Sequence, residues 1–137
     1  MNIKQFVLSN DVDYSNALID ETLLKQAESA LGVKFGDELK TYLLQYGYLG
    51  YSFVEFYGMN SRQKLESDLV KQSLYLHKYF PKTQSYVVIE NQGEGDYYLV
   101  DSQDTVYEFI TETNNLIAKQ MKLFDFIVSR FKCADNY

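Results

Sequence analysis

Residues 86–110 carry the pattern that most restricts how this chain folds. Runs rich in β-branched and aromatic residues alternate with short polar stretches, and they predict strands at 86–91, 96–101 and 105–110. Gln92–Gly95, between the first two strands, holds two glycines, which adopt the backbone angles of tight turns. We therefore expect a β-hairpin with a four-residue loop, extended by a turn at Ser102–Asp104 into an antiparallel meander.

Helical patterns surround this meander. Apolar residues spaced three and four apart predict helices at about 1–9, 20–31, 37–46, 61–80 and 121–131. Asp20 is a suitable N-cap, Ile19 and Leu24 occupy the positions of a hydrophobic staple, and Gly32 is a natural helix end. Pro81 ends the fourth helix.

The remaining segments complete the outline. Residues 51–57 predict one strand, residues 10–18 a polar loop, and residues 111–120 fit neither pattern. Helices, a run of strands and a closing helix indicate an α+β fold in which helices cover the sheet. A length of 137 residues suits one domain, so we expect a single domain over 1–137.

Composition favours a cytoplasmic protein. The N-terminus lacks a secretory h-region, and no stretch approaches 18 apolar residues, so we expect no membrane partner. Cys133 is the only cysteine, so a disulfide within the chain is impossible, as suits a reducing compartment.

The charge distribution is uneven. The net charge is −6, yet residues 83–118 contain no lysine or arginine. This segment holds seven acids: Glu90, Glu94, Asp96, Asp101, Asp104, Glu108 and Glu112. An acidic, base-free surface repels nucleic acid and attracts basic proteins.

Catalytic patterns are scarce. His77 is the only histidine, and a lone helical histidine is more often a partly exposed surface residue than a base. One histidine and one cysteine make neither a structural zinc site nor a His-based nucleophilic set. The QGEGD stretch precedes a strand and lacks a basic residue, so turn chemistry explains it better than phosphate binding. We expect no enzyme activity, no metal and no cofactor.

Three segments resemble a known family when taken in order. They are AESALGVKFGDELKTYLLQYG (27–47), VVIENQGEGDYYLVD (87–101) and KLFDFIVSRF (122–131). Together they are similar to the SUKH superfamily, which includes the yeast Smi/Knr cell-wall assembly regulators and many bacterial proteins. The resemblance spans about residues 19–132 and implies a curved sheet wrapped by helices. Gly36 departs from it, because the family usually has proline where the second helix opens.

The resemblance also implies a role. Bacterial members are typically immunity proteins that bind and neutralise a toxin, often a nuclease, whose active face is basic. An acidic surface complements such a face, and tyrosine offers a large, rigid anchor. We expect partner contacts from the hairpin and its neighbours: Glu90, Glu94, Asp96, Tyr97, Tyr98, Asp101, Asp104 and Glu108. A second interpretation is an intracellular adaptor that scaffolds regulatory partners.

Overall fold

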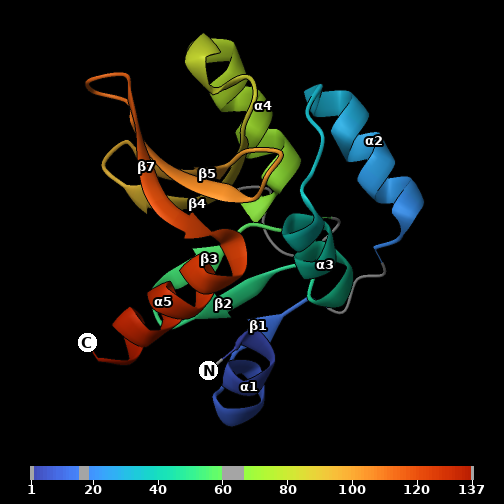
Figure 1. Cartoon of the computed structure of the whole chain (residues 1–137), viewed down its shortest axis with the longest axis vertical. Coiled ribbons are helices and arrows are strands. Elements are labelled where there is room, and N and C mark those ends of the chain that lie inside the picture. The colour runs from blue at the N-terminus through green and yellow to red at the C-terminus, as the bar shows by residue number, and fades with distance from the viewer. Residues whose placement is uncertain (1, 16–18, 60–66, 137) are drawn as a thin grey trace.

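The computed structural model describes residues 2–15, 19–59 and 67–136 and has an α+β architecture (Figure 1). Five α-helices lie in these residues: α1 Ile3–Ser9, α2 Glu21–Leu31, α3 Asp37–Gln45, α4 Leu69–Tyr79 and α5 Leu123–Asp135. Seven strands accompany them: β1 Asp13–Tyr14, β2 Leu49–Tyr51, β3 Val54–Phe56, β4 Val87–Gly93, β5 Asp96–Val100, β6 Thr105–Ile110 and β7 Asn115–Lys122. A short 3-10 helix, η2, spans Pro81–Thr83.

The strands form two antiparallel sheets, with orders β1-β2-β3 and β4-β5-β6-β7. The predicted meander is confirmed, because the strands expected within 86–110 are β4, β5 and β6. Residues 111–120, which fit no pattern, form a turn and most of β7. The predicted α+β class is therefore confirmed, with one strand more in the meander.

Helices α4 and α5 lie on opposite faces of the four-stranded sheet (Figure 1). On one face, the Val88 amide donates a hydrogen bond to Ser73 Oγ of α4 at 2.9 Å. On the other face, the Phe126 ring of α5 packs edge-on against Tyr98, with centroids 4.6 Å apart. Side chains alternate between the faces of a strand, so each helix contacts a different set of β5 and β6 residues.

Helix α2 begins and ends where its sequence predicts. Asp20 Oδ1 accepts a hydrogen bond from the Leu23 amide at 2.9 Å, which satisfies one free N–H of the first turn. Ile19 and Leu24, the two staple residues, are both buried. Gly32 ends the helix with a φ of 66°, the left-handed conformation that glycine adopts without a Cβ penalty.

The hairpin turn is shorter than predicted. Strand β4 continues to Gly93, which pairs with Asp96, so the loop contains only Glu94 and Gly95. Their φ angles are 56° and 84°, and two positive values in a two-residue loop define a type I′ turn. The prediction of a four-residue loop was wrong because Gly93 belongs to an irregular strand end and not to the turn.

Two segments contain more strands than predicted. Residues 51–57 were expected as one strand, but β2 and β3 are separated by a turn in which Ser52 has a φ of 55°. The expected loop at 10–18 contains β1, which pairs with β2 through Asp13 and Gly50. Strand β1 is too short to show a pattern of its own, since its pairing depends on a segment far along the chain.

Two helix boundaries also differ. Helix α4 begins at Leu69, after Asp68, whose side chain accepts a hydrogen bond from the Lys71 amide at 2.9 Å. The part of this predicted helix at 61–66 lies outside the described residues. Helix α5 begins at Leu123, two residues later than predicted, because Met121 and Lys122 continue β7.

An aromatic cluster joins the ends of the chain to the small sheet. The Phe131 ring of α5 lies 5.1 Å from Phe6 of α1 and 5.6 Å from Phe56 of β3, measured between centroids. All three side chains are buried, and they belong to the hydrophobic core that also reaches the four-stranded sheet. Among the described helices, none has the length and apolar character needed to cross a bilayer.

Candidate partner-binding surface

The free end of the four-stranded sheet brings several acidic side chains together. Glu94 is exposed at the β4–β5 turn, and Asp96 and Tyr97 follow it half-buried at the start of β5. The Thr111 amide donates a hydrogen bond to the Gly95 carbonyl at 3.1 Å, so the β6–β7 turn lies against the β4–β5 turn. The exposed Glu112 therefore joins the same end of the molecule. We call Glu94, Asp96 and Glu112 the acidic tip.

A row of side chains crosses the middle of the sheet on the α5 face. Glu90, Tyr98 and Glu108 are cross-strand partners on β4, β5 and β6. Arg130 of α5 donates two hydrogen bonds to Glu90, at 3.1 Å from Nε and 2.7 Å from Nη2. Lys119 of β7 lies 3.7 Å from Glu108. Two cations from outside the acidic segment thus neutralise two of its predicted partner-binding acids.

Burial removes Glu90 and Tyr98 from the accessible surface. Glu90 is 2% exposed and Tyr98 is 8% exposed. Burial raises the pKa of Glu90, and the hydrogen bonds and charge of Arg130 oppose that rise. The Arg130 guanidinium lies 5.5 Å from the centroid of the Tyr98 ring, a cation–π distance, so the ring also stabilises the charged arginine.

Asp101 and Asp104 lie at the opposite end of the sheet from the acidic tip. Asp101 Oδ1 accepts hydrogen bonds from the amides of Gln103 and Thr105, at 2.9 and 3.0 Å, and closes the β5–β6 turn. Asp104, 5% exposed, accepts hydrogen bonds at 3.0 Å from the amides of Glu38 and Leu39. Its carboxylate therefore caps α3, a role that its place in an acidic segment did not indicate.

The eight predicted residues thus divide into three groups. Glu94, Asp96 and Tyr97 lie together at the free end of the sheet, with Glu108 on the neighbouring strand. Three others are buried and serve the fold: Glu90, Tyr98 and Asp104. Asp101 is half-buried in a remote turn. The structure therefore reduces the surface available to a partner to fewer residues than the sequence predicted.

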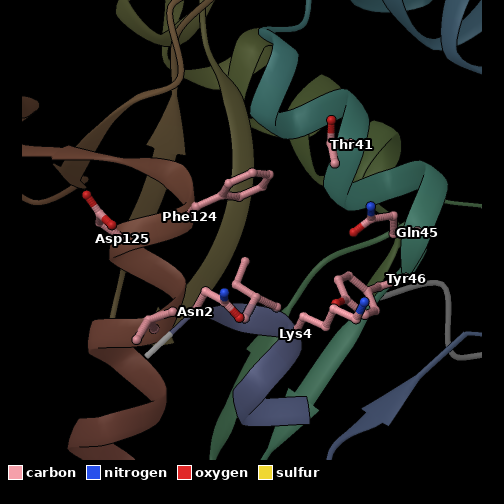
Figure 2. Close-up of a pocket in the computed structure, with 9 residues that line it drawn as sticks. Asn2, Lys4, Thr41, Gln45, Tyr46, Phe124 and Asp125 are labelled. Carbon is pink, nitrogen blue, oxygen red and sulfur yellow. The ribbon is translucent and has the colours of Figure 1, made fainter. Parts of the chain in front are cut away.

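A cavity between α1, α3 and α5 was not indicated by the sequence (Figure 2). It has a volume of about 290 Å³ and is lined by Asn2, Ile3, Lys4, Thr41, Gln45, Tyr46, Phe124, Asp125 and Val128. Figure 2 shows the Phe124 ring projecting from α5 toward α3, with Lys4 extended beside Tyr46. The lining contains no histidine or cysteine, so it offers no nucleophile–base pair of the usual kind.

His77 is buried and has a structural role. Its Nε2–H donates a hydrogen bond to the Tyr86 carbonyl at 2.7 Å, which ties α4 to the residue before β4. The expectation of a partly exposed surface histidine was wrong, because this hydrogen bond lets the ring enter the interior. Within residues 2–15, 19–59 and 67–136, no group of three or more His, Cys, Asp or Glu side chains is arranged to hold a metal ion.

Comparison with known proteins agrees with the architecture. The model of a family described as SMI1-KNR4 cell-wall (SUKH_5) matches residues 3–131. A search of curated proteins finds no match. The family match covers nearly the whole chain and includes α1 and β1, which lie before the segments that carried the resemblance. The chain therefore belongs to the SUKH (SMI1-KNR4) family.

Proposed function

We propose that this chain is an immunity protein that binds and neutralises a cognate bacterial toxin domain, a basic nuclease, through the acidic tip. SUKH membership supports this class of function, since the family resemblance implies toxin neutralisation for bacterial members. The acidic tip is the observation that identifies this end of the sheet as the proposed binding surface. Neutralisation is by protein–protein contact, without catalysis, metal or cofactor.

The tip has the properties of a steering surface. Glu94 and Glu112 are exposed on adjacent turns, and Asp96 lies between them at the strand end. Lys82 of η2 is a cation at this end, where its Nζ donates a hydrogen bond to the Asn114 carbonyl at 2.8 Å. Three acids against this lysine leave the tip negative, so a basic toxin face meets complementary charge on approach.

Tyr97 supplies the anchor beside these charges. It is half-buried on β5, so its ring is held by neighbours while part of it stays accessible. A tyrosine fixed in this way loses little side-chain entropy when a partner covers it. Glu108 adds charge to the adjacent strand, although Lys119 compensates it.

The test measures association of the purified protein with the toxin domain encoded beside its gene, at two salt concentrations. Glu94→Asn is the most informative variant, because asparagine suits the left-handed turn position and removes the charge. We expect Glu94→Asn and Asp96→Asn each to slow association by about two- to fivefold at low salt, and less at high salt. Tyr97→Ala should mainly speed dissociation.

Asp11→Asn is the matched control. Asp11 is an exposed acid that precedes β1, far from the four-stranded sheet, and the same change there should leave the association rate unaltered (Figure 1). If the tip variants associate as fast as the parent protein at low salt, the tip is only a solvated turn. A chain that holds several partners weakly, and no toxin stoichiometrically, would instead be an adaptor.

A further inference from the structure

Helix α4 presents an aromatic face to solvent. Leu74 is 44% exposed, Tyr75 53% and Tyr79 57%, although all three are large side chains. The two tyrosine rings lie 4.9 Å apart between centroids, and Lys78 Nζ lies 5.3 Å from the Tyr79 ring. An exposed cluster of large side chains on one helix is typical of a protein–protein contact.

The same helix face is basic. Lys71 and Lys78 are exposed on α4, and residues 69–82 contain no acid. At 100° per residue, both lysines lie on the Leu74 side of Tyr75, whereas Tyr79 lies on the opposite side. Around the helix, the order is therefore leucine, the two lysines, Tyr75 and then Tyr79.

The acidic tip lies next to the side of α4 that carries Tyr75 and Tyr79. Phe80, the C-cap residue of α4, packs on Phe109, with ring centroids 5.3 Å apart, and Phe109 is the cross-strand partner of Tyr97. Burial raises the pKa of Tyr97, and an electrostatic interaction with Tyr75 of α4 raises it further, so the two phenol groups lie near each other. Tyr97 therefore continues the aromatic face onto the sheet, toward the turn that carries Glu94. From α4 to the acidic tip, the surface therefore carries first lysines, then tyrosines and then acidic side chains.

We propose that this face is a two-fold symmetric interface between two copies of the chain. A two-fold axis through the tyrosines lays the lysines of one copy against the acidic tip of the other, and the reverse. The tyrosines then cover one another at the centre. A surface with opposite charges on its two sides and an aromatic middle is complementary to itself, so a second copy fits it.

The net charge of −6 does not prevent this contact. At physiological ionic strength the Debye length is about 8 Å, so repulsion between the bulk charges of two copies is largely screened. Opposite charges brought within a few ångströms at the interface are screened much less. Local complementarity therefore outweighs the overall repulsion at short range.

Sedimentation velocity of the full chain over a range of concentrations tests the proposal without any toxin. The parent protein should show a species of twice the chain mass whose population grows with concentration. Lys78→Glu and Glu94→Lys should each weaken dimerisation by about tenfold or more, because the two-fold axis doubles every reversed contact. Lys71→Glu is a second basic variant with the same expected effect, and Lys132→Glu, on α5 across the sheet, is the matched control with none.

An equimolar mixture of the two reversed variants gives the sharpest result. A heterodimer of Lys78→Glu with Glu94→Lys restores opposite charges at both symmetric contacts, so the mixture should dimerise where each variant alone stays monomeric. A parent protein that is monomeric at every concentration overturns the proposal, as does a dimer that both reversals leave intact. The dimer and a toxin would occupy the same acidic tip, so a toxin would displace the second copy. Either overturning outcome leaves the proposed toxin binding standing, because that binding is measured separately.

Discussion

Replacement of Asp104 by alanine is the perturbation whose effect follows most directly from the structure. The N-cap residue of α3 is Gly36, which has no side chain to satisfy the free amides of the first turn. The Asp104 carboxylate, 5% exposed, performs this function by accepting hydrogen bonds from Glu38 and Leu39 at 3.0 Å each. Asp104 also has a φ of 64°, a conformation that aspartate tolerates better than alanine.

These two contributions set the size of the effect. Loss of a charged cap with two hydrogen bonds to a helix N-terminus costs about 2 kcal/mol. Placing alanine in the left-handed conformation costs about 1 kcal/mol more. Asp104→Ala should therefore lower the free energy of unfolding by about 3 kcal/mol. For an m value of about 2 kcal/mol/M, the urea midpoint falls by about 1.5 M.

Two further variants separate the cap from the backbone. Asp104→Asn keeps the tolerance for a positive φ and one acceptor oxygen, so it should cost only about 1 kcal/mol. A Cβ at Gly36 would overlap the Asp104 carboxyl, so Gly36→Ser should destabilise the parent protein. In the Asp104→Ala background that space is vacant, and the hydroxyl introduced by Gly36→Ser can cap the helix locally, so the same change should recover about 1 kcal/mol.

Urea denaturation followed by circular dichroism measures all four combinations. The reversal in sign of the Gly36→Ser effect is the decisive observation, since only a shared cap predicts it. A loss below about 0.5 kcal/mol for Asp104→Ala would refute the reasoning, because surface substitutions without such a role fall in that range. Equal effects of Gly36→Ser in both backgrounds would refute it as well.

Three other changes have expected outcomes. Arg130→Met leaves Glu90 buried without its partner and should cost about 3 kcal/mol in urea denaturation at neutral pH. Because burial raises the folded-state pKa of Glu90, that loss should diminish as pH falls and the carboxyl takes up a proton; a loss that grows on acidification would contradict this. Tyr42→Phe removes a buried hydroxyl that donates to two backbone carbonyls, at 3.0 and 2.7 Å, and should cost about 1 kcal/mol by the same assay. Glu94→Asn should raise the thermal midpoint slightly, since asparagine suits a φ of 56°.

Much of the fold was predictable because its signals are local. The Asp20 cap, the Gly32 helix end and the alternation within 86–110 each act over a few residues, and each is present in the structure. The missed elements lack such signals. Strand β1 has only two residues. Strand β7 shows no apolar alternation in the sequence, because it is an edge strand whose side chains are mostly exposed or half-buried. Their identity depends on pairing with segments that the local pattern does not specify.

The acidic segment separates what the sequence alone determined from what the tertiary structure decided. The sequence determined its charge and the approximate positions of its turns, since these are properties of neighbouring residues, and the order of three motifs indicated the family. Folding decided which charges remain available. It brought Arg130 to Glu90 across 40 positions and Asp104 to the α3 N-terminus across 65 positions. Contacts of this kind depend on the packing of whole elements, so no local pattern of charge reveals which acids the fold uses and which it leaves at the surface.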